Sequence, residues 1–225
     1  MEIGVIGGGG VGQTLGAALA AQGHRVTLGI RNPSPEELAR ERRNAQTLSD
    51  WQAATGARVT TMAAAAAAGA VIINTTEGTG SLAALALAGA DNLAGKVLID
   101  VANPLDFSQG MPPFLPHAFT GTTSLGEQIQ VAFPKARVVK AFNTIAAAVM
   151  IQPGLIPGDH DLFIAGNDAD AKATVMDIAR SFGWKHFVDL GDIVGARASE
   201  AVLPVWARLW QTGGSPVVNL RVVRG

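Results

Sequence analysis

The glycines at positions 7, 9 and 12 have a spacing, G-x-G-x-x-G, that suits the binding of a diphosphate. Gly7 allows a tight turn, and Gly9 has no Cβ, so a diphosphate can approach the backbone there. Gly12 lets a following helix pack closely on the preceding strand, and we expect Gly16 to extend that contact. Four consecutive glycines alone would also suit an unstructured loop, so the flanking sequence decides between these interpretations.

The flanking residues predict the elements that would position such a turn. Residues 1–6 are typical of a short strand, residues 13–22 of a helix that ends at Gly23, and residues 25–28 of a second strand. Strand, glycine turn, helix and strand within about thirty residues form the βαβ unit of dinucleotide-binding proteins. Unpaired N–H groups at the helix start, aided by the helix dipole, would face the diphosphate.

The end of the second strand indicates which dinucleotide is preferred. NAD-binding units carry an acid about 20 residues past the glycines to bind the ribose 2′-hydroxyl, whereas the first acid here is Glu36. Arg31 stands in that place, followed by Asn32 and Ser34, and a guanidinium attracts a 2′-phosphate that a carboxylate would repel. These residues predict a preference for NADP, and Arg40 could also lean towards the phosphate. The alternative is that Arg31 is a solvated surface residue.

The remaining chain alternates between strands and helices. We predict further strands at residues 57–61, 70–74, 96–101, 137–142, 161–165, 187–190 and, weakly, 216–224. We predict further helices at residues 34–48, 62–68, 81–90, 125–133, 169–182 and 199–211. This order predicts an α/β fold with a Rossmann-type, doubly wound and mostly parallel sheet. We expect one compact domain over residues 1–225, with a dinucleotide-binding core at 1–144 and an α/β extension at 145–225 that completes the sheet and pocket.

Three polar pairs follow predicted strands, where ligands bind in open α/β sheets. They are Thr75 with Thr76, Asn103 with Pro104, and Asn143 with Thr144. Each pair alone would suit an ordinary turn, but together they are consistent with a nicotinamide pocket. We expect the first two pairs to contact the cofactor and the third to contact a substrate. The long loop at 105–122 is a further segment able to cover this site.

Composition excludes several classes of protein. The net charge is -1 with no basic block, so neither nucleic acid nor a membrane surface is an expected partner. The chain has no cysteine or tyrosine, and its four histidines lack metal-ligand spacing. We therefore predict no catalytic nucleophile, no Tyr acid and no metal site. No apolar run reaches the ~20 residues of a spanning helix, and residue 1 leads straight into a strand, so we expect no signal peptide and a cytoplasmic setting.

Four stretches resemble the NADP reductases that depend on the deazaflavin coenzyme F420. They are residues 3–12, Gly-Ile-Arg at 29–31, VVKAFNT at 138–144 and FIAGND at 163–168. The cytoplasmic domain of the six-transmembrane ferric reductases is similar. The resemblance implies NADP binding, with Gly9, Gly10 and Val11 at the diphosphate and Arg31 at the 2′-phosphate. It also implies hydride exchange between nicotinamide and a deazaflavin or flavin, a reaction that needs no covalent nucleophile. The stretch at 107–114 departs from the family pattern, which leaves the deazaflavin more open than NADP.

Two alternatives to this oxidoreductase remain. One is a non-catalytic module that senses NADPH and reports it to a partner. The other is a reductase of a small carbonyl or imine substrate, although such enzymes usually need a positioned acid.

The C-terminal region predicts a homodimer. Trp206 and Trp210 lie four residues apart, hence on one helix face, which Leu203 and Leu209 extend. The apolar segment at 217–223 would then pack across a two-fold axis and close the open side of the partner's nicotinamide pocket, or it would fold back on its own sheet or loop.

Overall fold

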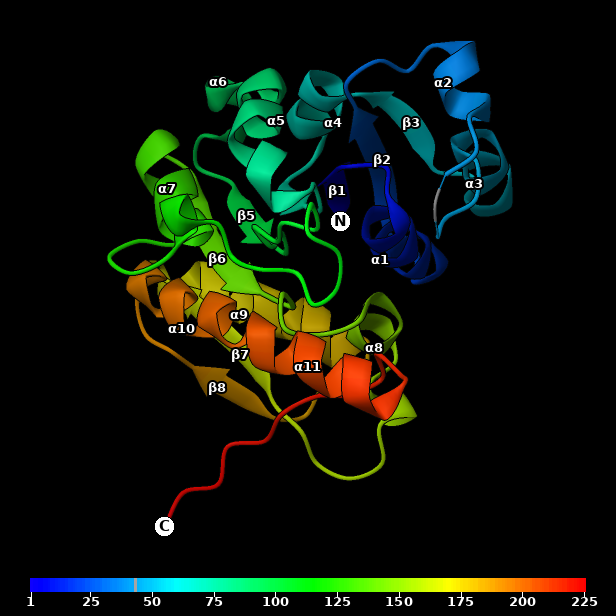
Figure 1. Ribbon diagram of the computed structural model, residues 1–225. Helices are drawn as coiled ribbons and strands as arrows, with labels where there is room; N and C mark the ends of the chain where they lie inside the picture. Colours follow the sequence, from blue (N-terminus) through cyan, green and yellow to red (C-terminus); the bar gives the residue numbers. More distant parts are fainter. Residues whose placement is uncertain (43) are drawn as a thin grey trace.

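The computed structural model describes residues 1–42 and 44–225 and contains one eight-stranded sheet (Figure 1). The strands are β1 (Glu2–Ile6), β2 (Arg25–Ile30), β3 (Arg58–Thr61), β4 (Val71–Asn74), β5 (Val97–Asp100), β6 (Arg137–Ala141), β7 (Leu162–Gly166) and β8 (Phe187–Asp189). Their order in the sheet is β3-β2-β1-β4-β5-β6-β7-β8, and only the β6–β7 pair is antiparallel. The α/β, mostly parallel fold predicted from the sequence is therefore confirmed.

The helices pack on both faces of this sheet (Figure 1). In the first part of the chain they are α1 (Gly10–Ala21), α2 (Pro35–Ala39), α3 (Leu48–Thr55), α4 (Met62–Ala68), α5 (Ser81–Ala88) and α6 (Ala90–Leu93). The later ones are α7 (Leu125–Ala132), α8 (Ala147–Ile151), α9 (Ala169–Ser181), α10 (Ala196–Ala201) and α11 (Leu203–Gly213). Short 3-10 turns lie at Gly78–Gly80, His117–Phe119, Pro153–Leu155 and Ile193–Gly195. Within the described ranges, every helix is too short or too polar to cross a lipid bilayer.

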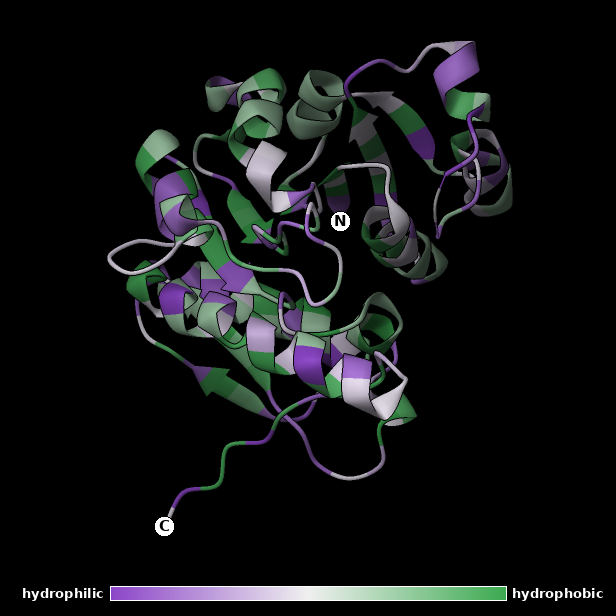
Figure 2. Ribbon diagram, viewed as in Figure 1, coloured by the Kyte–Doolittle hydropathy of each residue, from purple (hydrophilic) through white to green (hydrophobic). Residues whose placement is uncertain are grey.

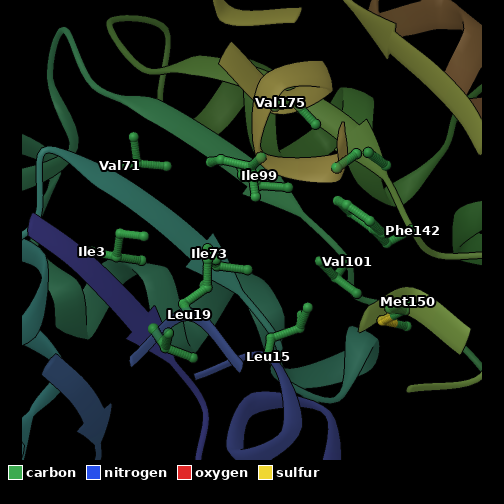
Figure 3. Packing of buried hydrophobic residues seen from close by; sticks show 14 of the residues in the cluster. Ile3, Leu15, Leu19, Val71, Ile73, Ile99, Val101, Phe142, Met150 and Val175 are labelled. Atoms are coloured by element: carbon green, nitrogen blue, oxygen red, sulfur yellow. The ribbon is translucent and has the colours of Figure 1, made fainter. Parts of the chain in front are cut away.

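Two hydrophobic clusters fill the two faces because strand side chains alternate between them. On one face Val71, Ile73 and Ile99 pack against α1 and α9 (Figure 3). On the other, Ile72 and Leu98 pack against α4, α5 and α7. The central strands are accordingly mostly apolar (Figure 2), although Asp100 and Lys140 lie within β5 and β6. Strands buried on both faces explain the continuous apolar runs in the sequence.

The chain changes direction at β1, which is where such sheets bind ligands. From β1 it passes outward to β2 and β3, then crosses back to place β4 on the other side of β1. The turn after β1 and the turn after β4 therefore face each other. The backbone N–H of Thr75 donates to the carbonyl of Ile6 at 2.9 Å and joins the two turns.

The helix predicted from residue 13 begins three residues earlier, at Gly10. Gly9 is its N-cap in an extended conformation, and no side chain caps it. Glycine has low helix propensity, so the sequence pattern places the start too late. Gly16 mainly contacts another helix, since a Cβ on it would lie 2.9 Å from the Trp51 ring and 3.6 Å from Val26 of β2.

The single helix predicted at residues 34–48 is wrong. Ser34 caps α2 as expected, but α2 ends at Ala39 and an irregular segment leads to α3. The helix ends where the Arg40 backbone becomes extended, with ψ 130°. Beyond it, Arg42 donates from Nη2 to the Glu37 carbonyl at 2.9 Å, and Asn44 has a positive φ of 57°. Thr47 then caps α3, a helix that was not predicted.

The C-terminal predictions were also partly wrong. The last helix is divided into α10 and α11, with a proline in the first turn of α11. Residues 216–224 form no strand; instead Leu220 accepts a hydrogen bond from the Asp161 N–H at 2.9 Å. The Trp206 and Trp210 rings do share a face, with centroids 5.4 Å apart. Leu203 is buried, so it does not extend that surface.

Candidate functional site

The glycine turn after β1 leaves open space at one glycine and none at the other two. Gly7 has φ +119°, and a Cβ on it would lie 2.9 Å from Thr75 backbone atoms. A Cβ on Gly12 would lie 2.1 Å from the Gly7 carbonyl oxygen, which fixes the close helix–strand contact. A Cβ on Gly9, in contrast, would meet no atom of the described residues within 4 Å. The turn is thus tightly packed beneath and open above Gly9, as a diphosphate cradle requires.

The N-terminus of α1 lies at this opening. The first N–H groups of any α-helix lack an intrahelical acceptor, and here they belong to Gly10, Val11 and Gly12. Gln13, one residue on, donates from Nε2 to the carbonyls of Gly8 at 3.2 Å and Gln46 at 3.0 Å. These bonds tie the segment between α2 and α3 to the glycine turn.

A cavity of about 520 Å³ runs from the glycine turn to the ends of β2 and β4. Its walls include these residues: Gly7, Gly8, Gly9, Ile30, Arg31, Glu37, Arg40, Arg42, Met62, Thr75, Thr76, Glu77, Gly80 and Ala84. The cavity brings together five of the predicted cofactor residues: Gly7, Gly9, Arg31, Thr75 and Thr76.

Four charged groups gather at the β2 end of this cavity. Glu37 accepts from Arg40 Nε at 2.8 Å and from Arg42 Nη2 at 2.9 Å, and Arg31 lies exposed in the same wall. Three guanidinium groups and one carboxylate give a local charge of +2. Hydrogen bonds from Arg40 and then Arg42 lower the pKa of Glu37 to about 2. The end of the cavity nearest Arg31 is therefore positive, even though Glu37 places an acid there that sequence spacing had not indicated.

Two predicted residues near Arg31 have other surroundings. The Ser34 hydroxyl accepts from the Glu37 N–H at 3.3 Å, so it caps α2. Asn32 is exposed beside Arg31 and does not line the cavity.

The turns after β4, β5 and β6 meet at a second point. Gly78 donates from its N–H to the Asn103 carbonyl at 3.1 Å, and a Cβ there would lie 2.2 Å from that carbonyl carbon. Asn103 in turn donates from Nδ2 to the Asn143 carbonyl at 2.6 Å. Pro104 and Thr144 are buried beside this contact. The structure thus joins Asn103 and Asn143, as predicted, but neither lines the cavity beside Arg31.

A strained residue precedes Asn143. Phe142 has φ +63°, a conformation that costs a bulky residue about 1–3 kcal/mol and is found chiefly at functional sites. It reverses the chain directly after β6. The Asn143 side chain that follows is 3% exposed, and its Oδ1 has no hydrogen-bond partner within the described part of the chain. A buried orphan acceptor is costly unless a ligand or water donates to it.

A buried ionic cluster that sequence reasoning missed lies behind these turns. Lys140 Nζ is 2.8 Å from Asp100 Oδ2 and 2.9 Å from Glu200 Oε1, and all three side chains are at most 1% exposed. Asn74 joins the cluster through a 2.9 Å bond from Nδ2 to Asp100 Oδ1, and its own Oδ1 accepts from Thr76 Oγ1 at 2.7 Å. The cluster therefore connects the wall of the cavity to α10.

The cluster keeps Lys140 charged. Burial alone would lower the pKa of Lys140, but the carboxylates of Asp100 and Glu200 outweigh it, so the pKa is raised. The sequence contains one signal of this cluster, because Lys140 lies inside an apolar strand. A lysine in a strand that is buried on both faces requires a carboxylate partner. Its partners, 40 and 60 residues away, could not be read from local spacing.

Comparison with known proteins identifies the family. The family described as NADP oxidoreductase, coenzyme F420-dependent, matches residues 2–104. The crystal structure of a candidate F420-dependent NADP-reductase from Arthrobacter sp. FB24 is 48% identical, covers 100% of both chains and has a TM-score of 0.93. The chain belongs to the coenzyme F420-dependent NADP oxidoreductase family.

Two curated relatives match this chain over only part of their own length. The metalloreductase STEAP3 of Rattus norvegicus is 33% identical over 211 residues, which are 91% of this chain and 38% of the rat protein. The F420-dependent NADP reductase of Methanocaldococcus jannaschii is 30% identical over 115 residues, or 51% of each chain. Both relationships expected from the sequence are confirmed.

The same fold occurs in a reductive aminase. The reductive aminase of Aspergillus terreus, crystallised with NADPH4, cyclohexanone and allyl amine, is 19% identical with a TM-score of 0.62. The alignment covers 94% of this chain and 62% of that chain. At this identity the likeness is one of fold, and it assigns no substrate to the family member described here.

Proposed function

We propose that this protein binds NADP(H) and transfers hydride between the nicotinamide and a deazaflavin- or flavin-type acceptor. The observation that carries the proposal is the continuity of the cavity, which joins the open face of Gly9 to the positive wall beside Arg31. A dinucleotide carrying a 2′-phosphate matches this combination of an anion cradle and clustered guanidinium groups. When bound, NADPH would supply the hydride.

The residues present fit that cofactor in specific roles. Gly9, Gly10 and Val11 would hold the diphosphate with backbone N–H groups, and Arg31 would hold the 2′-phosphate. Thr75 and Thr76, with Asn103 and Pro104, would continue the binding surface. Asn143 and Thr144 would lie where nicotinamide and acceptor meet. Hydride transfer mainly requires two rings held about 3–3.5 Å apart, so no nucleophile or acid–base pair is needed.

The test has two parts. Equilibrium titration with NADPH and NADH should show clear preference for NADPH; equal affinities or a preference for NADH would refute the cofactor assignment. Assays with a deazaflavin, FMN and riboflavin should show multiple turnover with at least one of them. Tight NADPH binding without turnover on any acceptor would instead support the NADPH-sensing alternative. Turnover confined to carbonyl or imine substrates would support the third possibility.

A further inference from the structure

The orientation of the Asn143 amide is fixed by its neighbours. Its Nδ2 donates to the Ser199 carbonyl at 3.2 Å and to Asn103 Oδ1 at 3.3 Å. A backbone carbonyl can only accept, so the amide nitrogen must face Ser199 and Oδ1 must face the other way. Among the described residues nothing donates to that oxygen. The protein thus presents one buried acceptor with a defined direction.

The two residues that accept from the Asn143 amide are each the chain neighbour of a residue that contacts Lys140. On the β5 side, Lys140 Nζ donates to the carbonyl of Ala102 at 2.6 Å, directly before Asn103. On the α10 side, it lies 2.9 Å from Glu200 Oε1, directly after Ser199. Lys140 itself lies on β6, three residues before Asn143 in the chain. One ammonium group therefore holds the β5 end and α10 at the distance from which both contact the Asn143 amide.

The charged groups of the cluster find their partners within the described part of the protein. Glu200 also accepts from the N–H groups of Leu125 at 2.9 Å and Gly126 at 3.0 Å, at the N-terminus of α7. Asp100 Oδ1 accepts from Asn74 and from the Ala102 N–H. Lys140 reaches three oxygens, from Asp100, Ala102 and Glu200, which match its three protons. Among the buried side-chain atoms of these residues, as far as the structure describes the chain, Asn143 Oδ1 is the one without a hydrogen-bond partner.

We propose that Lys140 is a positioning residue that aims Asn143 Oδ1 at the carboxamide N–H2 of the nicotinamide. The inference rests on the proposed function and adds to it the atom that orients the reacting ring. The carboxamide has two N–H donors, which suits an acceptor that is buried and otherwise unpaired. Lys140 does not touch the cofactor in this arrangement; it acts through Ala102 and Asn103 on one side and through Glu200 and Ser199 on the other.

The test compares two ligands that share the adenosine half: NADPH and adenosine 2′,5′-bisphosphate, which lacks the nicotinamide. In Lys140→Met, NADPH affinity should fall about tenfold, the size of one lost hydrogen bond, and kcat should fall with it. Affinity for the bisphosphate should stay within about twofold, because Gly9 and Arg31 are untouched. Lys172→Met is the matched control: Lys172 pairs with Asp189 outside the site, and both affinities should be unchanged.

A double-mutant cycle separates positioning from general support. If Lys140 acts through Asn143, adding Lys140→Met to Asn143→Ala should lower the affinity for NADPH by less than about a further twofold. Independent, additive losses of affinity would overturn the proposal, as would an equal loss of affinity for both ligands.

If Lys140→Met does not fold, Glu200→Gln keeps the ammonium group and should show a smaller loss of affinity that is again selective for NADPH. A Glu200→Gln protein that loses both ligands equally, or neither, would overturn it too. Failure of the wild-type protein to bind NADPH would instead refute the proposed function.

Discussion

Lys140 Nζ lies 2.8 Å from Asp100 Oδ2 on the neighbouring strand, with both side chains wholly buried. The pair links β5 and β6 at their carboxyl ends, directly beneath the residues expected to meet the nicotinamide. Burial without compensation would be costly for either charge, so each group depends on the other.

Lys140→Met should destabilise the protein by about 3–5 kcal/mol, because it leaves two buried carboxylates without their cation. Urea unfolding of the variant and of Lys172→Met provides the measurement. The control breaks a pair whose carboxylate partner is exposed and should cost at most about 1 kcal/mol. Similar losses of unfolding free energy in the two variants would show that the buried cluster contributes no more to stability than the Lys172–Asp189 pair.

Gly9→Ala and Gly12→Ala should affect different properties of the protein, cofactor affinity in the first variant and stability in the second. A methyl group on Gly9 meets no atom of residues 1–42 and 44–225 within 4 Å, so stability should change by roughly 0.5 kcal/mol or less. NADPH affinity should nevertheless fall by about tenfold or more, or ~1.4 kcal/mol, because the diphosphate loses its approach.

Gly12→Ala should instead lower stability, since its Cβ would lie 2.1 Å from the Gly7 carbonyl oxygen. Thermal unfolding and NADPH titration of both variants give the comparison. If the Gly9→Ala protein binds NADPH as tightly as the wild type, the glycine turn is not part of the cofactor site.

Arg31→Ala should weaken NADPH by about 1.5–3 kcal/mol, the value of hydrogen bonds to a charged group, and leave NADH nearly unchanged. The reason is that only NADPH carries the 2′-phosphate. Isothermal titration with both cofactors measures the difference, with Arg180→Ala on α9 as a control for loss of one surface arginine. Parallel changes for the two cofactors would contradict a 2′-phosphate site at Arg31.

The carboxyl group of Glu37 should titrate with a pKa of about 2 in the folded protein, because Arg40 and Arg42 donate to it. Its folded pKa is below the ordinary value of 4.5, so the stabilisation is present above pH ~4.5 and is lost as pH falls towards 2. Carboxyl-carbon NMR follows this titration directly. Arg40→Ala should raise the pKa towards its ordinary value; a pKa near 4.5 in the wild-type protein would show that the arginines are not engaged.

The homodimer remains a prediction with two competing arrangements of the C-terminal segment. Within one chain, Trp206 Nε1 donates to the Val218 carbonyl at 3.3 Å, and Asn219 donates from Nδ2 to the Asp161 carbonyl at 2.9 Å. These contacts correspond to the folded-back arrangement, yet Val223 is 84% exposed. We expect sedimentation of the full chain as a dimer, and monomers with largely intact NADP binding after deletion from Gly213 onward. A monomer at micromolar concentration would rule the dimer out.

The sequence predicted the elements that local pattern determines. The glycine turn, the apolar strands and the alanine-rich α4 follow from spacing and propensity, and they determine the fold and the cavity around Gly9 and Arg31. The segment after α2 was mispredicted because the Arg42 side chain donates to the Glu37 carbonyl, a contact that helix propensity does not predict.

The nicotinamide end depends on pairs distant in sequence. Asn103 and Asn143 were predicted to converge because both follow parallel strands. The contacts of Lys140 with Asp100 and Glu200 could not be predicted in the same way, since Glu200 lies on α10, whose position depends on its packing against α7. The positive φ of Phe142 is likewise imposed by its surroundings, against the preference of an aromatic residue.

The most direct test of the account is transfer of label from NADPH. The protein is mixed without oxygen with NADPH deuterated at C4 of the nicotinamide, in separate 4R and 4S forms, and with a 5-deazaflavin. The account predicts that one of the two forms delivers deuterium to C5 of the deazaflavin over many turnovers, because two rings held face to face exchange hydride directly. Tight NADPH binding with no deuterium at C5 from either form would contradict direct hydride transfer to this acceptor.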